Sequence, residues 1–219
     1  MVTGKHPSRI RFAKVAARCF LEQTHSEKEL IIINDSSFPV GCSHSQVREI
    51  MVPYSLDTTL GDLRNAGILH ARGELVLQWD DDDWHDPRRM ELQASFWERG
   101  SVVLLKQQIR YSFPHNTAYL HKTPKGIVGT ILHERNCKVR YPSVRCGEDL
   151  VFLRQFRYHK VFQYGSPLYI RFYHGENTLD ANYIMGRFAQ ERNRDRWRLP
   201  AQAQCFLRFI LDEYYAEVK

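Results

Sequence analysis

Four consecutive aspartates at residues 80–83 are the most unusual chemical feature of the sequence. They directly follow the apolar run ELVLQW at 74–79, which has the composition of a buried strand. Two carboxylates about 4 Å apart repel each other by roughly 4 kcal/mol at the effective dielectric near a protein surface. We therefore expect a positive charge to compensate the cluster, and the nature of that charge bears on function.

The spacing of the aspartates suits a divalent cation. Side chains alternate faces along a strand, so Asp80 and Asp82 would project to one side if the strand continues, and Asp81 and Asp83 to the other. Carboxylate oxygens are hard ligands for Mg²⁺ or Mn²⁺, and such cations keep coordination positions for substrate phosphates. The alternative is a strand-to-helix turn whose aspartates cap backbone N–H groups. That alternative explains Asp86 and could include Asp83, but it does not explain four acids in a row.

The segments around the cluster alternate between helical and strand-like patterns. Thr59 and Asp62 form a capping box, and Asp86-Pro87 supplies an N-cap and a first helical residue. The elements expected in order are a helix at 7–22, strands at 29–35 and 48–53, a helix from Thr59 to Gly73, a strand at 74–79 and a helix from Asp86 to Arg99. This order predicts an α/β fold with a mainly parallel sheet flanked by helices. Ligands of such sheets bind at the carboxyl ends of the strands, so Asp35 should share one rim with the aspartate cluster.

The second half of the chain has weaker patterns. Strand-like runs occur at 101–112, 126–134 and 166–174, and a helical run occurs at 148–158. Apolar residues at helical spacing in the tail predict a packing helix there; they are Phe206, Phe209, Ile210 and Tyr214. The chain begins with a short run, Met1-Val2-Thr3, that leads directly into the first helix. Two interpretations stay open: a first strand that starts upstream of Met1, or a fold that tolerates a stub.

The composition is that of an ordinary folded protein. The 219 residues are 43% hydrophobic and 26% charged, and no repeat or low-complexity linker divides them, so we expect a single domain over 1–219. The net charge of +6 favours anionic partners in general. We interpret the basic run at 187–198 as a solvated helical face, with contact to nucleic acid or an anionic membrane surface as the alternative. Five cysteines without a CxxC pair argue against a disulfide framework. No apolar run approaches the about 20 residues of a membrane-spanning helix.

Several motifs together resemble glycosyltransferase family 2, whose members have the GT-A fold. The register D-x-D-D-x-x-x-P over residues 80–87 is similar to the D-x-D segment of that family. Four stretches follow the family's order: FLEQTHSEKELIIINDSS (20–37), LGDLRNAGILHARGELVLQWDDDD (60–83), GEDLVFL (147–153) and YHGENT (173–178). Each stretch is weak alone, but their order and separation are specific and cover most of residues 1–180. Asn34 departs from the pattern, because the family has an aspartate in that place.

The resemblance implies a nucleotide-sugar site in the first half of the chain. Asp35 would hydrogen-bond the uracil or the ribose, and Thr3 would also touch the base. Arg64 would lie near the nucleotide and the acidic cluster, or would only hold its helix to the strand rim through a salt bridge. Asp80 would face the ribose, with Asp81 beside it in the same site.

The resemblance also implies a metal site and a catalytic base. Asp82 would be the principal ligand of Mn²⁺ or Mg²⁺, and His174 would complete that site unless it is only structural. Asp149 would take the proton of the acceptor hydroxyl, which gives inversion at the anomeric carbon. Glu148 would bind the acceptor or cap the helix that begins there. A slip of the metal register to Asp81 and Asp83 stays an alternative.

The function implied is metal-dependent, inverting transfer of a sugar from a nucleotide diphosphate sugar, with UDP favoured, to a hydroxyl acceptor on a glycan or lipid-linked substrate. Hexosyl or N-acetylhexosaminyl transfer is expected. Residues 1–100 would form the nucleotide-sugar-binding half, 101–180 the acceptor and catalytic half, and 181–219 the C-terminal helices. We expect a cytoplasmic protein, with loose association at the inner face of the membrane as an alternative, and no nucleic-acid partner.

Three rivals remain to be weighed. A haloacid-dehalogenase-type phosphatase would need Thr or Val where Trp84 stands, and a sugar nucleotidyltransferase would need a Gly-rich loop that GKHPSR does not supply. A catalytically inactive module of the same fold, which binds a nucleotide sugar or a protein, is the alternative from another class.

Overall fold

The computed structural model describes residues 1–219 apart from 5–6, 145, 176, 178–185, 187–198 and 217–219. The basic run at 187–198, which was expected to form a charged helix, lies outside the described residues. Among the helices that are described, none combines the length and the apolar character needed to cross a membrane.

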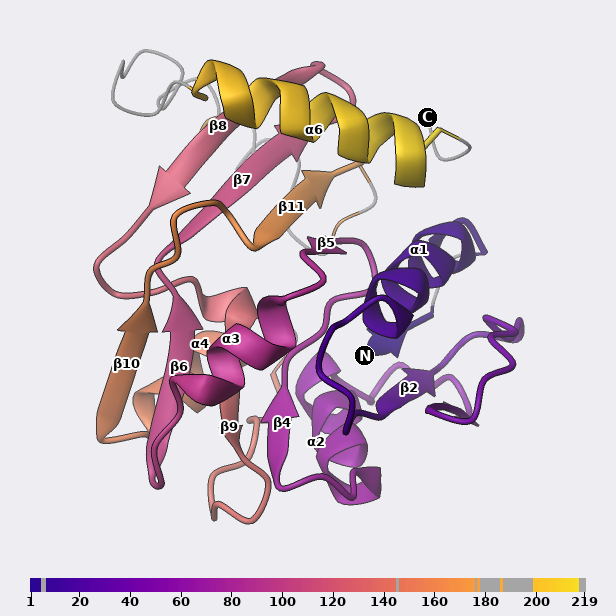
Figure 1. Ribbon diagram of the computed structural model, residues 1–219. Helices are drawn as coiled ribbons and strands as arrows, with labels where there is room; N and C mark the ends of the chain where they lie inside the picture. The colour runs from indigo at the N-terminus through magenta and orange to yellow at the C-terminus, as the bar shows by residue number, and fades with distance from the viewer. Residues whose placement is uncertain (5–6, 145, 176, 178–185, 187–198, 217–219) are drawn as a thin grey trace.

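The central layer is a mainly parallel sheet, as the alternation of elements predicts (Figure 1). Its first part has the order β1-β2-β3 and its second part the order β10-β6-β9-β4. A parallel bridge between Val2 and Asp80 joins β1 to the chain just after β4. Among the described strands of this layer, the antiparallel pairs are those of β9 with its two neighbours, β4 and β6. The other strand pairs are parallel. The strands are β1 (Val2–Thr3), β2 (Leu30–Asn34), β3 (Val47–Met51), β4 (Leu75–Leu77), β6 (Ser101–Leu105), β9 (Leu132–Glu134) and β10 (Tyr158–Phe162).

A second sheet has the order β5-β11-β7-β8 and is covered by the long helix α6 (Ala201–Tyr214), as Figure 1 shows. The predicted strand at 101–112 is in fact two strands that belong to different sheets, separated by Lys106 alone. The strands are β5 (Trp84–His85), β7 (Gln107–Ser112), β8 (Thr117–Lys122) and β11 (Tyr169–Tyr173).

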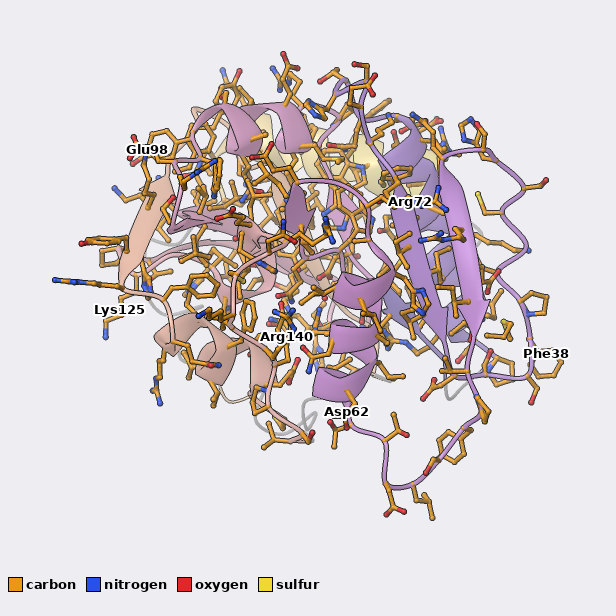
Figure 2. The ribbon with its side chains drawn as sticks, turned by 90° about the horizontal axis from the view of Figure 1, so that it is seen from below. Phe38, Asp62, Arg72, Glu98, Lys125 and Arg140 are labelled. Carbon is orange, nitrogen blue, oxygen red and sulfur yellow. The ribbon has the colours of Figure 1, made fainter. Side chains whose placement is uncertain are left out.

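The helices α1 (Arg9–Leu21) and α2 (Leu60–His70) cover opposite faces of β2. Leu30 and Ile32 pack in the cluster that contains α1, whereas Ile31 and Ile33 pack in the cluster that contains α2. Successive strand side chains point to opposite faces, so a strand covered on both faces is apolar throughout. The predicted capping box of α2 is present, and Figure 2 shows Asp62 at the start of that helix.

Several predicted boundaries are wrong. Helix α3 (Arg89–Ser95) ends before Arg99, and its N-cap is Arg88; Asp86 instead accepts a hydrogen bond from the Arg88 N–H at 2.9 Å. The run at 126–134 divides into a 3₁₀ turn (Val128–Thr130) and β9, and the run at 148–158 into α4 (Glu148–Arg154) and the start of β10. The tail helix packs as predicted, although Phe209 is 60% exposed.

Two glycines of α2 allow a matched test of how this helix packs. A Cβ on Gly61 would lie 2.0 Å from the carbonyl oxygen of Pro142, whereas a Cβ on Gly67 would meet nothing closer than Ile33 Cγ1 at 3.7 Å. We expect Gly61→Ala to lower the free energy of unfolding by about 2–3 kcal/mol, because backbone must move. Gly67→Ala should leave it unchanged or raise it by up to about 1 kcal/mol through helix propensity. Denaturant unfolding measures both effects, and equal losses in the two variants would contradict this packing.

Candidate active site at the strand ends

The aspartate segment turns away from the sheet after β4. A single bridge pairs Asp80 with Val2, and turn residues follow before β5, so the strand does not continue through the cluster. The burial nevertheless alternates: Asp81 and Asp83 are buried, whereas Asp80 and Asp82 are partly exposed. Two of the four carboxylates therefore face a space that a ligand could reach, and the other two face the protein.

Arg9, the first residue of α1, binds two of the aspartates. Its Nε donates to Asp81 Oδ2 at 3.1 Å, and its Nη2 donates to the other oxygen of the same carboxylate. The same Nη2 lies 3.2 Å from Asp82 Oδ2. Burial raises the pKa of Asp81, and the Arg9 guanidinium opposes that shift. The start of α1 is thus fixed to the acidic cluster by a bidentate ion pair.

Asp82 has two further partners in the segment after β11. His174 Nε2 and Asn177 Nδ2 each lie 3.1 Å from Asp82 Oδ2. The ring of Phe12, from α1, stacks on the ring of His174 with centroids 4.3 Å apart. Burial opposes ionisation of Asp82, but the hydrogen bond of His174 and the charge of Arg9 hold its pKa well below the usual value. Asp82 is therefore a carboxylate at neutral pH.

Arg64 connects the aspartate cluster to α4. Its Nη2 donates to Asp80 Oδ1 at 3.0 Å, and its Nε donates to Glu148 Oε1 at 3.2 Å. Gln78 Nε2 also donates to Asp80 Oδ1, at 3.3 Å, and the guanidinium lies 5.7 Å from the ring centre of Tyr141. Burial raises the pKa of Glu148, and the charge of Arg64 opposes that shift. The salt bridge that was one of two interpretations of Arg64 is present.

Asp83 has a structural role. The hydroxyl of Tyr169 donates to Asp83 Oδ2, and the N–H of Phe172 donates to Oδ1 at 2.9 Å. Burial, together with the neighbouring charge of Asp82, raises the pKa of Asp83 well above its usual value. Asp83 therefore accepts a backbone N–H, but that N–H belongs to β11 and not to a strand-to-helix turn, so Asp83 anchors the segment to β11.

Thr3 and Asp35 lie at the ends of the adjacent strands β1 and β2. The N–H of Asp35 donates to the Thr3 carbonyl at 3.2 Å, and both residues are buried. Gly4 has φ +145°, and a Cβ on it would lie 1.7 Å from Asp35 Oδ1, so only glycine fits there. Asn34 donates from Nδ2 to Glu49 Oε1 at 2.7 Å, which ties the neutral amide to β3.

Asp149 is half-buried and lies next to Glu148 at the start of α4, which follows Gly147 at φ 75°. Burial raises the pKa of Tyr141, and the charge of Asp149 acts in the same direction. Asp149 therefore lies close enough to Tyr141, which is beside Arg64, to interact with it electrostatically. The contacts form a network of two groups, which meet where Asp80 and Asp81 are adjacent in the chain: Arg9, Asp81, Asp82 and His174 form one, and Arg64, Asp80 and Glu148 form the other. Thr3 and Asp35 lie at the neighbouring strand ends.

The positive charges that compensate the aspartates come from the protein itself. Arg9 and Arg64 form ion pairs with three of them, and the charge of Arg171, on β11, favours the ionised forms of Asp82 and Asp83. The acidic cluster therefore does not need a metal ion for its charge balance. A metal cofactor stays a prediction that rests on the resemblance and on the ligand chemistry.

Asp82 and His174 are two candidate metal ligands side by side. Within the described part of the chain, no group of three or more His, Cys, Asp or Glu side chains could hold a metal ion. Mg²⁺ and Mn²⁺ are commonly held by one or two carboxylates together with substrate phosphates and water. The two side chains therefore fit a cation whose other ligands come with the substrate, and they do not form an all-protein cage.

The sequence reasoning expected Arg64 and His174 near the aspartates but missed their other partners. Asn177 lies within the quoted stretch YHGENT and could have been assigned with His174. Arg9 also had a signal, because four adjacent acids require cations and Arg9 lies in the first turn of the helix expected at 7–22. Nothing local marks the remaining partners, which are Gln78, Tyr169 and Arg171.

Comparisons with known proteins show the family and the fold of the chain. The sequence model described as "Glycosyl transferase family 2" matches residues 13–161. Among curated proteins no match was found. The crystal structure of S. aureus TarS 1-349 in complex with UDP-GlcNAc is similar in fold, with a TM-score of 0.60 and 14% identity over 78% of this chain and 57% of that chain. The structure of the same protein with UDP has a TM-score of 0.58 and 14% identity, over 80% of this chain and 60% of that chain.

A longer TarS structure gives a TM-score of 0.56 and 16% identity, over 98% of this chain and 43% of that chain. This chain thus spans about three fifths of the TarS 1-349 chains, 57% to 60% of their length. The likeness confirms the predicted fold, a mainly parallel α/β sheet with a mixed second half.

Proposed function

Because the chain belongs to glycosyl transferase family 2, we propose that it transfers a sugar from a nucleotide diphosphate sugar to a hydroxyl acceptor. One observation carries this proposal: acidic groups from distant segments meet at the carboxyl ends of parallel strands. Arg9 links Asp81 and Asp82 there, and Arg64 links Asp80 to Glu148. Open α/β sheets bind their ligands at this edge.

The donor would lie across the ends of β1, β2 and β4. Asp35 and Thr3, at two of these ends, are suited to the base and ribose, and Asp80 is suited to the ribose because it is partly exposed. Asp81 would act through its ion pair with Arg9, which orients the start of α1. The burial of Asp81 and Asp83 supports the register in which Asp80 and Asp82 face the ligand.

The chemistry proposed is a single displacement with inversion. The acceptor oxygen attacks the anomeric carbon opposite the leaving diphosphate, and a carboxylate takes the proton of the acceptor hydroxyl. Asp149 suits that role, because it is half-buried and ionisable, whereas Glu148 is buried and paired with Arg64. The guanidinium groups of Arg9 and Arg64 lie beside the expected diphosphate position and would favour its negative charge.

Asp82 and His174 would hold Mn²⁺ or Mg²⁺, which would offset the charge that develops on the leaving nucleoside diphosphate. Asp82 suits this role because its carboxylate is ionised and partly exposed, and His174 suits it because its ring is fixed by Phe12. The protein contributes the orientation of both side chains before substrate binds.

The donor proposed is a UDP-sugar of the N-acetylhexosaminyl or hexosyl type. The support comes from fold neighbours, since the similar TarS structures were obtained with UDP and with UDP-GlcNAc. The acceptor proposed is a hydroxyl group of a glycan or a lipid-linked substrate. Family membership does not specify the donor or the acceptor, and a donor screen is needed to establish the donor.

The ion pairs themselves favour one alternative function. Asp82 Oδ2 already contacts Arg9, His174 and Asn177, which would suit an inactive module that binds a nucleotide sugar without turnover. In that case the arginines would be permanent partners of the acids and would not become available to a diphosphate.

A screen of nucleotide sugars tests the proposal. Nucleotide release is measured with each donor in the presence of Mn²⁺, Mg²⁺ or a chelator, and calorimetry measures UDP binding with and without Mn²⁺. We expect UDP to bind more tightly with the metal and at least one UDP-sugar to release UDP in a metal-dependent way. Binding without turnover of any donor would favour the inactive module, and no binding of any nucleotide would refute both functions.

A further inference from the structure

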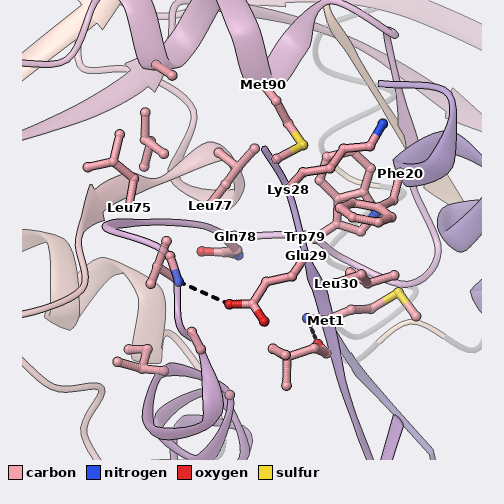
Figure 3. Close-up of a pocket in the computed structure, with 18 of the residues that line it drawn as sticks. Met1, Phe20, Lys28, Glu29, Leu30, Leu75, Leu77, Gln78, Trp79 and Met90 are labelled. Carbon is pink, nitrogen blue, oxygen red and sulfur yellow. Dashed lines mark hydrogen bonds between the residues drawn. The ribbon is translucent and has the colours of Figure 1, made fainter. Parts of the chain in front are cut away.

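A cavity of about 490 Å³ lies within the central sheet, between β2 and β4 (Figure 3). Leu30 and Ile31 of β2 line one wall, and the residues of β4, Leu75–Leu77, line the other. Met1 lies at one end of the cavity, and Val2 also lines it. We call this cavity the strand slot. It does not coincide with the acidic cluster, although Arg64 and Gln78 contribute to both.

The strand slot is the position that a longer β1 would occupy. β1 is 2 residues long, whereas β2 is 5 residues long and runs past it. Val2 pairs with Ile33 on one side and with Asp80 on the other. Continued backwards in the same parallel register, positions before Met1 would fall beside Ile31 and Leu30 on one side and beside 75–78 on the other. On the β4 side, the four positions before Met1 would fall beside residues 78, 77, 76 and 75, so the slot corresponds to about four residues of extended chain.

Backbone hydrogen-bonding groups face the slot from β2. The N–H of Ile33 donates to the Met1 carbonyl at 2.9 Å, and the nitrogen of Met1 donates to the Ile31 carbonyl at 2.8 Å. Successive N–H groups of a strand alternate sides, so the N–H of Ile31 points the same way as that of Ile33, into the slot.

Backbone N–H groups of β4 also face the slot. The N–H of Gln78 donates to the Ile131 carbonyl at 2.8 Å, toward β9, so the N–H groups of Leu75 and Leu77 point away from β9 and into the slot. In the described sheet, β4 is an edge strand on this side apart from the bridge at Asp80. An extended chain in the slot could thus form β-sheet hydrogen bonds with β2 on one side and with β4 on the other.

The side chains around the slot suit a strand buried on both faces. Phe20, Met90 and Ala94 line one face of the slot, and Ile68 and Ala71 line the other. Strands that are covered on both faces of a parallel sheet are apolar at every position. Glu29 closes the far end, where its Oε1 accepts a hydrogen bond from the N–H of Gly73 at 3.0 Å (Figure 3).

The nitrogen of Met1 supports the same conclusion. It lies inside the protein at the end of the slot, hydrogen-bonded to the Ile31 carbonyl (Figure 3). As a free amino group its pKa is lowered to about 5, chiefly by burial, because a charged ammonium is poorly solvated there. A peptide N–H at this position would make the same hydrogen bond without a charge.

We propose that the strand slot is a binding site for an extended apolar segment of about four residues that continues β1 beyond Met1 and is supplied by chain preceding Met1 in a longer form of the protein. The segment pairs in parallel with β2 and with β4 and makes the two parts of the central sheet continuous. This inference does not depend on the proposed function.

The test adds a short extension to the chain. One version carries Val-Val-Ile-Val joined to Met1, and a matched version carries Gly-Ser-Gly-Ser at the same place. We expect the apolar extension to raise Tm by about 10 °C over the matched version, because it fills the slot and completes two ladders. Hydrogen exchange at the amides of Ile31, Leu75 and Leu77 should slow by at least about 100-fold with the apolar extension only.

Three results would overturn the proposal. One is equal Tm and equal exchange at these amides in the two extended versions. Another is an intact mass of the protein from its native cells that corresponds to a chain starting at Met1, because the segment would then not belong to this chain. Protection by a free Val-Val-Ile-Val peptide added in trans, without protection by the fused extension, would also contradict continuity with β1.

Discussion

The Asp82→Asn variant should lose metal-dependent release of UDP from its donor, with a fall in rate of about 10²–10³-fold. The amide keeps the shape of the side chain but removes a carboxylate that is ionised, partly exposed and in contact with His174. The variant should also lose the gain in UDP affinity that Mn²⁺ gives the unaltered protein. Donor turnover at several Mn²⁺ concentrations, with calorimetry of UDP binding, measures both effects.

Asp86→Asn is the matched control for this prediction. Asp86 lies in the same acidic segment, but its carboxylate binds Arg88 at the start of α3 and contacts none of the network residues named above. It should keep most of the activity and its metal dependence. Since Asp82→Asn also removes a partner of Arg9 and His174, thermal unfolding should accompany the assay. A folded Asp82→Asn protein with unaltered metal-dependent turnover would refute the role of Asp82.

Asp149→Asn is expected to lower kcat by about 10²–10⁴-fold, since the acceptor hydroxyl would lose its base. KM for the donor and the affinity for UDP should change little, because the residues proposed to contact the base and ribose, Asp35 and Asp80, are not altered. Steady-state kinetics with a varied donor separates the two effects. A loss of donor affinity without a loss of kcat would assign Asp149 to binding.

Glu148→Gln gives the contrasting result for the same helical turn. Glu148 is buried and paired with Arg64, so the variant should lose stability by about 2 kcal/mol. Its activity should fall less than that of Asp149→Asn, and the remaining activity should keep the donor specificity. If Glu148→Gln lost more kcat than Asp149→Asn while it stayed folded, Glu148 would be the better candidate for the base.

The first half of the fold could be predicted because its signals are local. The β-branched run before Asn34 and the capping box at Thr59 specify β2 and the start of α2 with few alternatives. The division of 101–112 at Lys106 could not be predicted, since no glycine or proline marks it. The surroundings decide it, because the two parts pair with different strands.

The site was predictable to the extent that it consists of strand ends. Asp35 and the aspartates could be placed on one rim from the order of the elements alone. Arg64 was expected near the cluster, but its pairing with Glu148 and the pairing of Arg9 with Asp81 were not, because these partners are 84 and 72 positions apart in the sequence. Pairings between residues so far apart in sequence depend on how the helices pack. Neither the composition nor the hydrophobic periodicity of a sequence indicates that packing.

Lys106 has a consequence for how the protein can move. Its N–H donates to the Phe162 carbonyl of the central sheet at 2.8 Å, and its carbonyl accepts from Thr123, which follows β8 of the second sheet, at 3.0 Å. Lys106 is therefore hydrogen-bonded to both layers. We expect these bonds to resist rotation of one layer as a rigid body against the other. Entry of a substrate and escape of a product should depend on rearranging loops around a fixed frame, and not on a hinge between two lobes.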